Sequence, residues 1–128
     1  MSKLPPPPGC NVALTERVLV RFLREETQRI GMTHAVLGLS GGIDSALVVE
    51  LAVRALGAEN VLAVAMPYRE SHPDSLRLAQ DSAAHAQVQL EVADITPMAD
   101  GYLANNPDLQ DTSLAAVRLR RGNIFSRL

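Results

Sequence analysis

The sequence is poor in the side chains that mark several common classes of protein. Its 128 residues include no tryptophan, and aromatic residues make up only 3%, which argues against a platform on which single-stranded nucleic acid would stack. The one cysteine, Cys10, excludes an intramolecular disulfide and fits a reducing compartment. No uninterrupted apolar stretch approaches the roughly 20 residues of a membrane span, and no signal peptide opens the chain. A cytoplasmic protein without a membrane partner is therefore expected.

An excess of charge of one sign is missing as well. Lys and Arg number 12 and Asp and Glu 14, so the formal net charge is −2. A nucleic-acid binder would show a strongly basic face, so no nucleic-acid partner is predicted. Hydrophobic residues make up 47% of the chain, enough for a packed core, and the length is that of one domain or of part of a larger one.

The chain divides into a short arm and one domain. Residues 1–11 include four consecutive prolines, Pro5–Pro8, which cannot enter a helix interior or a central strand. We therefore predict a flexible, extended arm followed by a domain over residues 12–128.

A helix is expected to open the domain. Asn11 is placed to cap it, and Gly31 to stop it just after Ile30. Apolar side chains recur along it at helical spacing, namely at Leu14, Val18 and Phe22. Such a stripe covers either the chain's own sheet or a partner subunit.

Beyond this helix, strand-like and helix-like segments alternate. Strands are predicted over 35–39, 61–66 and 88–92, with helices over 44–56, 73–86, from 94 onward with a break near 105–107, and from about 112 to the end. This alternation predicts parallel strands with right-handed crossovers, that is, a doubly wound α/β sheet flanked by helices. The unbroken apolar run over 35–39 predicts a strand that is buried on both faces.

The loop after the first strand carries the residues that suit a phosphate group. Gly41 and Gly42 allow the backbone to turn sharply and to approach an anion closely. The helix that follows would direct its free N–H groups and its positive dipole end at the anion. Ser40 and Ser45 add hydroxyl donors.

Asp44 is out of place in a site for an anion alone, because its charge repels phosphate. It suits a site in which Mg²⁺ lies between the carboxylate and phosphate oxygens. The loop matches neither the Walker pattern nor the dinucleotide-binding glycine pattern. The alternative is a plain tight turn in which Asp44 or Ser45 caps the helix.

The pattern SGGxDS over Ser40–Ser45 resembles the signature of the N-type ATP pyrophosphatases, also called PP-loop enzymes. These enzymes cleave ATP between its α and β phosphates and transfer AMP to a substrate oxygen. Two further stretches, Met66–Ser71 and Gly122–Arg127, are similar to motifs of the NAD synthetases within that family. The resemblance covers nearly everything after Asn11.

The resemblance implies a Rossmann-like fold of the adenine nucleotide alpha-hydrolase type and a set of ligand contacts. Asp44 would bind Mg²⁺, while Asn123 and Arg127, four residues apart on one helix face, would meet nicotinic acid adenine dinucleotide. Arg69, Ser71, Arg118 and Arg121 receive no firm role. The residues implied to bind ATP are Gly38, Leu39, Ser40, Gly41, Gly42, Ile43, Asp44, Ser45 and Met66.

The implied reaction is the ATP-dependent amidation of nicotinic acid adenine dinucleotide to NAD by ammonia. It proceeds through an acyl-adenylate, releases AMP and pyrophosphate, and needs no covalent nucleophile, so no catalytic residue is assigned beyond the ATP loop. The family is homodimeric, and its synthetase domain is longer than this chain. We therefore expect an incomplete sheet and an isolated part that is inactive. Because no amidase domain is recognised before the loop, the expected nitrogen source is free ammonia or ammonia from a separate partner.

Two alternatives to this enzyme stay open. One is another PP-loop adenylating ligase with a different acceptor, and the other is a non-catalytic nucleotide-binding fragment.

Overall fold

The computed structural model describes residue 9 and residues 11–69 and 71–105. Residues 1–8 and Cys10 of the predicted arm lie outside this part of the chain, as does the helix predicted from about residue 112. The elements are α1 (Val12–Arg29), β1 (Ala35–Gly38), α2 (Ile43–Leu56), the 3₁₀-helix η1 (Ala58–Asn60), β2 (Val61–Ala65), α3 (Pro73–Ala86), β3 (Gln89–Val92) and α4 (Thr96–Ala104).

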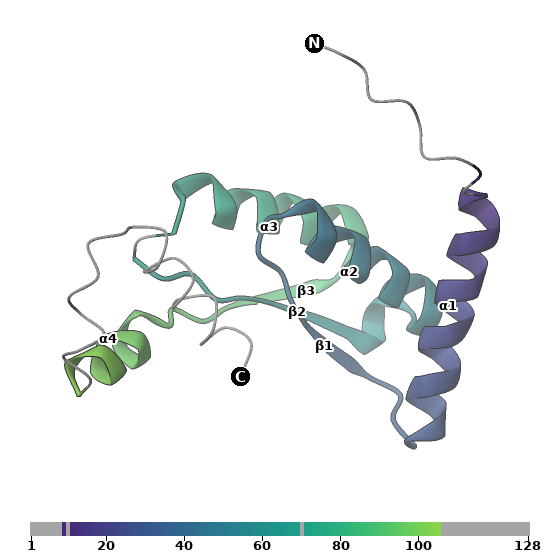
Figure 1. Ribbon diagram of the computed structural model, residues 1–128, viewed down its shortest axis with the longest axis horizontal. Coiled ribbons are helices and arrows are strands. Elements are labelled where there is room, and N and C mark those ends of the chain that lie inside the picture. The colour runs from purple at the N-terminus through teal and green to yellow at the C-terminus, as the bar shows by residue number, and fades with distance from the viewer. Residues whose placement is uncertain (1–8, 10, 70, 106–128) are drawn as a thin grey trace, which may run out of the picture.

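The three strands form one parallel sheet in the order β1-β2-β3. Both crossover helices, α2 and α3, lie over the same face of this sheet (Figure 1). Two right-handed crossovers that step in the same direction across a sheet produce this arrangement. The predicted parallel α/β architecture is confirmed, and the described part of the chain holds one layer of crossover helices.

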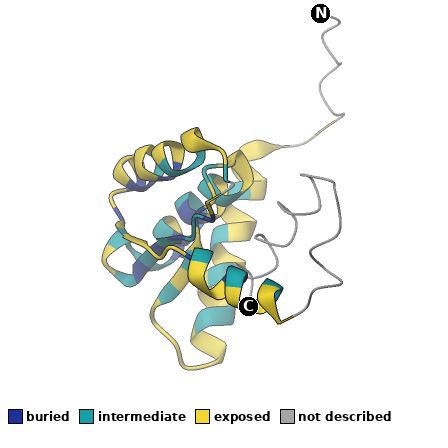
Figure 2. Cartoon of the chain, turned by 90° about the vertical axis from the view of Figure 1, so that its left-hand side faces the viewer, coloured by how far each residue is buried: buried dark blue, intermediate teal, exposed yellow. Residues whose placement is uncertain are grey.

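The core lies between the sheet and this helix layer. Figure 2 shows the buried residues on the inner sides of the helices and along the strands, while α1 is largely exposed. Alanine dominates the inward face of α2 and α3, and these small side chains let the helices lie close to the sheet. The main buried cluster consists of Leu39, Val49, Ala52, Val61, Ala63, Ala65, Ala79, Ala83, Ala86 and Val88.

Strand β1 departs from the expectation of burial on both faces. The register pairs Val36 with Leu62, which places both on the side of the sheet opposite the core residue Ala63. Val36 is 67% exposed, because no helix of the described part covers this side. The prediction from the apolar run is therefore wrong for β1, which stands at an edge of the described sheet.

Helix α1 begins and ends as the sequence predicts. The side chain of Asn11 caps it by accepting a hydrogen bond from the Leu14 backbone N–H at 3.1 Å. Gly31 follows the C-cap residue Ile30 with φ of +73°, a conformation that glycine adopts without strain.

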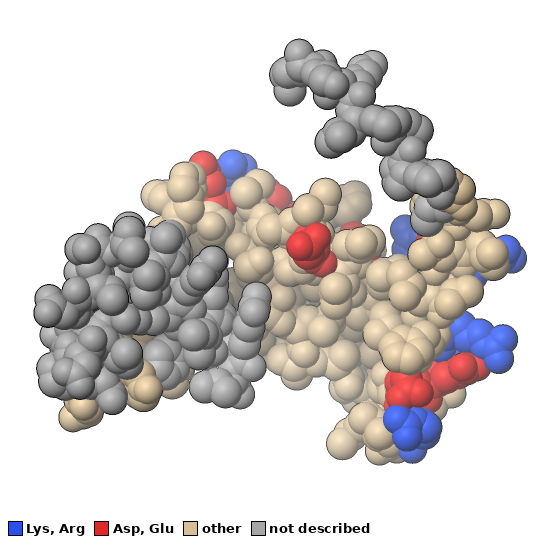
Figure 3. Space-filling model, in the orientation of Figure 1, with Lys and Arg blue, Asp and Glu red and all other residues tan. Residues whose placement is uncertain are grey.

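The outer side of α1 does not cover the sheet. The helix packs against α2, where Arg24 Nε donates to the Ala55 carbonyl at 3.0 Å and Arg54 pairs with Glu16. The stripe at Leu14, Val18 and Phe22 stays about half exposed. Charged side chains gather at the side of the molecule where α1 lies (Figure 3). None of the helices in the described part has the length and apolar content to cross a membrane.

Candidate nucleotide-binding site

The carboxyl ends of β1 and β2 lie side by side and bring the predicted ATP-contacting segments together. A Cβ built on Gly38 would lie 3.4 Å from the Met66 Cε atom. The Leu39 backbone N–H donates to the Val64 carbonyl at 2.9 Å, so the pairing continues into the loop. Ligands of open parallel sheets bind at this edge. The segment Gly38–Ser45 and Met66 therefore border one place in the fold.

Gly41 makes the bend that starts the loop. Its φ is +80°, and a Cβ built on it would lie 2.3 Å from the backbone oxygen of Ser75 in the first turn of α3. The positive φ strains any residue other than glycine, and the close approach leaves no room for a Cβ unless the backbone shifts. The loop after β1 is therefore pressed against the start of α3, a contact that the sequence does not indicate.

The two serines of the loop hold each other in place. Ser45 Oγ accepts from the Ser40 backbone N–H at 3.2 Å and donates to the Gly42 carbonyl at 2.9 Å. The two hydroxyl oxygens are 3.1 Å apart, and Ser40 Oγ accepts from the Gly42 N–H at 3.4 Å. The hydroxyls predicted as phosphate donors therefore line one small loop with a fixed shape.

The start of α2 leaves its backbone donors available. The N-cap residue Gly42 has no side chain to accept from them, and among the described residues none accepts from the N–H groups of Ile43, Asp44 or Ser45. The first helical hydrogen bond runs from the Ala46 N–H to the Gly42 carbonyl at 3.2 Å. Free N–H groups together with the positive end of a helix dipole form an anion site.

Asp44 is exposed in the first turn of α2 and forms no ion pair within the described part of the chain. No group of three or more potential metal ligands occurs there either. A Mg²⁺ ion held by this single carboxylate would take its other ligands from phosphate oxygens and water, which is the usual arrangement for this ion. The carboxylate therefore fits a metal that arrives with a nucleotide.

Hydrogen bonds hold the described residues of the loop after β2 in place. It closes on itself, because the Ser71 N–H donates to the Tyr68 carbonyl at 2.7 Å and Ser71 Oγ accepts from the Tyr68 N–H at 3.1 Å. The Arg69 N–H donates to Thr96 Oγ1 at 3.1 Å. Asp100 accepts from both the Tyr68 hydroxyl and the Arg69 guanidinium. Sequence reasoning missed Thr96 and Asp100, since neither belongs to a motif.

The remaining predicted site residues lie beyond the structural description. Asn123 and Arg127, predicted to meet the dinucleotide, fall outside the described residues, as do Arg118 and Arg121.

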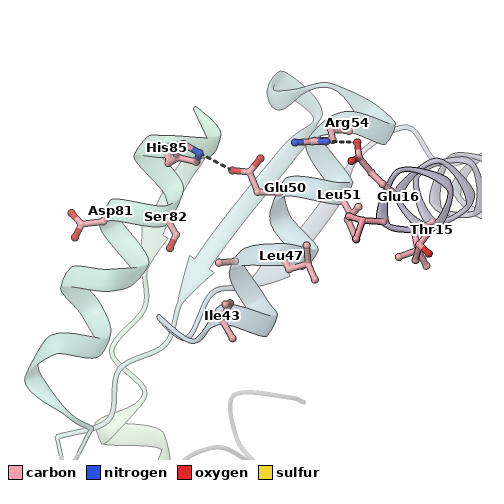
Figure 4. A pocket seen from close by; sticks show the side chains of 13 residues that line it. Thr15, Glu16, Ile43, Leu47, Glu50, Leu51, Arg54, Asp81, Ser82 and His85 are labelled. Carbon is pink, nitrogen blue, oxygen red and sulfur yellow. Dashed lines mark hydrogen bonds and ion pairs between the residues drawn. The ribbon is translucent and has the colours of Figure 1, made fainter. Parts of the chain in front are cut away.

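A separate groove of about 700 Å³ is lined by side chains of α1, α2 and α3 (Figure 4). It shares only Ile43 with the loop after β1, and its lining is mainly apolar. Arg54 and Glu16 pair at one end, and His85 faces Glu50 across it at 3.8 Å. The lining residues, called the helix groove below, are Val12, Thr15, Glu16, Leu19, Ile43, Ala46, Leu47, Glu50, Leu51, Arg54, Asp81, Ser82 and His85.

Two curated proteins similar to this chain carry the same description. The chain is 50% identical over 117 residues to the NH(3)-dependent NAD(+) synthetase of Trichlorobacter lovleyi, which covers 91% of this chain and 40% of that protein. It is 47% identical over 114 residues to the protein of the same description from Chlorobaculum tepidum, covering 89% and 39%. The chain thus spans about 40% of the length of these relatives.

Two solved structures extend the comparison. The glutamine-dependent NAD⁺ synthetase of Acinetobacter baumannii, in complex with ADP, is 32% identical with a TM-score of 0.77, over 92% of this chain and 23% of that chain. The NH3-dependent NAD synthetase of Campylobacter jejuni, in complex with the nitrate ion, is 29% identical with a TM-score of 0.75, over 88% and 48%. The family model described as NAD synthase matches residues 15–128. With nearly its whole length matched, the chain belongs to the NAD synthase family.

Proposed function

We propose that this chain carries the ATP-pyrophosphate-binding part of an ammonia-dependent NAD synthetase. The observation that carries the proposal is the loop after β1, in which Gly41 bends the backbone and α2 begins with free N–H groups. The N–H donors of this loop would face the negatively charged oxygens of a bound pyrophosphate group. The family to which the chain belongs suggests the reaction that this site would serve.

ATP would lie across the carboxyl ends of β1 and β2. Its phosphates would accept from the N–H groups of Ile43, Asp44 and Ser45, and its adenosine would lie against the backbone at Met66. The Asp44 carboxylate would hold Mg²⁺, whose charge lowers the repulsion between the phosphates and an attacking anion. The hydroxyl oxygens of Ser40 and Ser45 already lie in the loop, so each hydroxyl would only have to turn its O–H bond to donate to the phosphates.

The proposed chemistry forms an amide in two steps. A carboxylate oxygen of nicotinic acid adenine dinucleotide attacks the α-phosphorus of ATP, the bond to the β-phosphate bridging oxygen breaks, and pyrophosphate leaves. Ammonia then attacks the acyl carbon, loses a proton and displaces AMP, which leaves NAD. Because the substrate's own carboxylate is the nucleophile, the protein's task is to bind, align and neutralise charge. Asn123 and Arg127 are proposed to hold the dinucleotide.

Ammonia is the proposed nitrogen source. The two relatives that are 47% and 50% identical are named as NH(3)-dependent, whereas the glutamine-dependent structure is 32% identical. The helix groove contacts none of the loop residues except Ile43, so it is not proposed as part of the ATP site.

The proposal includes a homodimer in the cytoplasm. Leu14, Val18 and Phe22 on α1 stay about half exposed. Exposed apolar side chains that recur along one helix suit an interaction site, and a second copy of the chain is the proposed partner. A cytoplasmic setting supplies ATP and fits the single cysteine.

The test supplies the full-length protein with ATP, Mg²⁺, ammonia and nicotinic acid adenine dinucleotide. We expect AMP, pyrophosphate and NAD in equal amounts, with no AMP when the dinucleotide is omitted. AMP release with another carboxylate acceptor in its place would identify a different adenylating ligase. ATP binding without AMP release under any of these conditions would identify a non-catalytic nucleotide-binding protein.

A further inference from the structure

We propose that Asp100 on α4 is a positioning residue for the nucleotide, because it latches the loop after β2 against α4. This inference rests on the proposed function, since it assigns a role toward ATP binding at the ends of β1 and β2. Asp100 touches none of the residues predicted to contact ATP, so its effect has to pass through Tyr68 and Arg69.

The latch uses both oxygens of one carboxylate. Asp100 Oδ1 accepts from the Tyr68 hydroxyl at 3.2 Å, and Asp100 Oδ2 accepts from Arg69 Nη1 at 2.8 Å. The Arg69 guanidinium carbon also lies 5.6 Å from the centre of the Tyr68 ring, within the range of a cation–π contact. Two neighbouring side chains are therefore fixed by a single residue that lies 32 and 31 positions further along the chain.

The contacts of Asp100 are partly buried, so they constrain the loop more strongly than an ion pair on an exposed surface would. Tyr68 is only 7% exposed and forms a small apolar cluster with Ile95 and Ala99. A buried tyrosine hydroxyl needs a hydrogen-bond partner, and Asp100 supplies it. Side-chain exposure is 34% for Asp100 and 59% for Arg69, so the ion pair itself is partly screened by solvent.

The cluster borders the predicted adenosine contact. Met66 packs against the cluster of Tyr68, Ile95 and Ala99, so the position of the Tyr68 ring sets one wall beside Met66. The same loop leads into α3, whose first turn meets Gly41 at Ser75. A loop that swings away from α4 would therefore disturb both the adenosine wall and the contact that backs the phosphate loop.

The decisive comparison uses three variants of the full-length protein. Asp100→Ala removes both acceptors. Asp100→Asn keeps one oxygen for the Tyr68 hydroxyl but loses the charge that faces Arg69. Glu25→Gln is the matched control, because it breaks another arginine–carboxylate pair, with Arg21 at 2.6 Å, on the exposed side of α1. The probe is ATP with Mg²⁺, measured by calorimetry, together with the melting temperature of each variant.

We expect Asp100→Ala to weaken ATP binding about tenfold, which is the scale of coupling through a positioning residue. Asp100→Asn should give a smaller loss and Glu25→Gln none. In steady-state assays the KM for ATP should rise, while the KM for nicotinic acid adenine dinucleotide stays unchanged. Hydrogen exchange at the Arg69 and Ser71 backbone N–H groups should accelerate in Asp100→Ala and not in Glu25→Gln.

Unchanged ATP affinity in Asp100→Ala, with a wild type that binds ATP, overturns the positioning role and leaves the proposed function intact. A wild type that does not bind ATP overturns the proposed function and the positioning role together. If Asp100→Ala fails to fold, Asp100→Asn and Tyr68→Phe decide the matter. A drop in ATP affinity in both supports the latch, and unchanged affinity in both overturns it.

Discussion

The loops after β1 and after β2 end at the same edge of the sheet and treat their polar groups in opposite ways. The first binds its two serines to each other and leaves the N–H groups at the start of α2 without acceptors in the described part of the chain. In the second, the backbone N–H groups of Tyr68, Arg69 and Ser71 find acceptors within the loop or at Thr96 on α4, and Asp100 accepts from the Tyr68 and Arg69 side chains. Unsatisfied donors favour an incoming anion, whereas satisfied ones build a rigid wall. One edge of the sheet thus combines a receptive loop after β1, whose free donors suit an anion, with a supporting loop after β2, whose hydrogen bonds keep it rigid.

The largest effect is expected at Gly41. Gly41→Ala combines a positive φ with a Cβ placed 2.3 Å from the Ser75 backbone oxygen, so we expect a loss of about 2 kcal/mol or more in folding free energy. ATP binding should become undetectable by calorimetry, because the loop must move away from α3. Denaturant unfolding and ATP titration measure the two effects.

Substitutions at two other glycines separate the two causes of the loss in Gly41→Ala, namely backbone strain and the close contact with Ser75. Gly31 has a φ of +73° with nothing within 4 Å of a built Cβ, so Gly31→Ala should lose about 1 kcal/mol through backbone strain alone. Gly42 has a φ of −86° and only an ordinary contact with Ser40 Oγ at 3.4 Å, so Gly42→Ala should lose less than about 1 kcal/mol. Equal losses for Gly41→Ala and Gly31→Ala would show that the contact with Ser75 is unimportant.

The next largest effect is expected at Asp44, and it tests whether the receptive loop binds a nucleotide together with a metal ion. Asp44→Asn should weaken binding of ATP in the presence of Mg²⁺ about tenfold, equivalent to about 1.4 kcal/mol, because the proposed metal ligand is lost. Stability should hardly change, since the side chain is exposed and unpaired in the described part. Titrations with and without Mg²⁺ check this. Equal weakening in both conditions would contradict the metal role.

A pair of serine variants tests the two loops directly. Ser45→Ala and Ser71→Ala each remove hydroxyl hydrogen bonds within a loop, so each should lower the folding free energy by about 1 kcal/mol. Only Ser45→Ala should also weaken ATP binding, by about threefold, because Asp100 still holds Tyr68 and Arg69 in Ser71→Ala. A comparable loss of ATP affinity in Ser71→Ala would remove the distinction between the receptive loop and the supporting one.

The smallest expected effect is a change in the melting temperature that depends on pH. Hydrogen bonds from the side chain and then the backbone N–H of Thr96 lower the pKa of Asp94 below its ordinary value of 3.8. A carboxyl group with a lowered pKa contributes stability above its ordinary pKa, and this contribution is lost as the pH falls through the lowered value. Asp94→Asn should therefore lower the melting temperature slightly at neutral pH, and the difference from wild type should vanish in strong acid. Melting curves across that range check the sign.

Much of the fold follows from local sequence signals. Asn11 and Gly31 bound α1 as predicted, and Pro73 begins α3 at the expected place. The predicted strands and their parallel pairing are also confirmed. Cap residues, prolines and apolar periodicity act over a few residues, so a single sequence reveals them.

The errors and omissions involve partners that are distant in sequence. Whether Val36 is buried depends on which helix covers its side of the sheet, and an apolar run does not contain that information. The Gly41–Ser75 contact and the role of Asp100 arise only when separate segments meet. Local motifs therefore predicted the candidate ATP loop, whereas the contacts that support this loop appear only in the three-dimensional arrangement.

The exposure of Val36 has a practical consequence for anyone who trims this protein for laboratory work. A version cut to residues 11–105 would present Val36, next to Leu62 and Val64 on one side of the sheet, and the open hydrogen-bonding edge of β1. Unpaired edges of this kind template association between chains and lead to aggregates. Val36→Lys would place a charge beside that edge, so a trimmed sample bearing this substitution should stay dispersed at concentrations where the unaltered fragment precipitates.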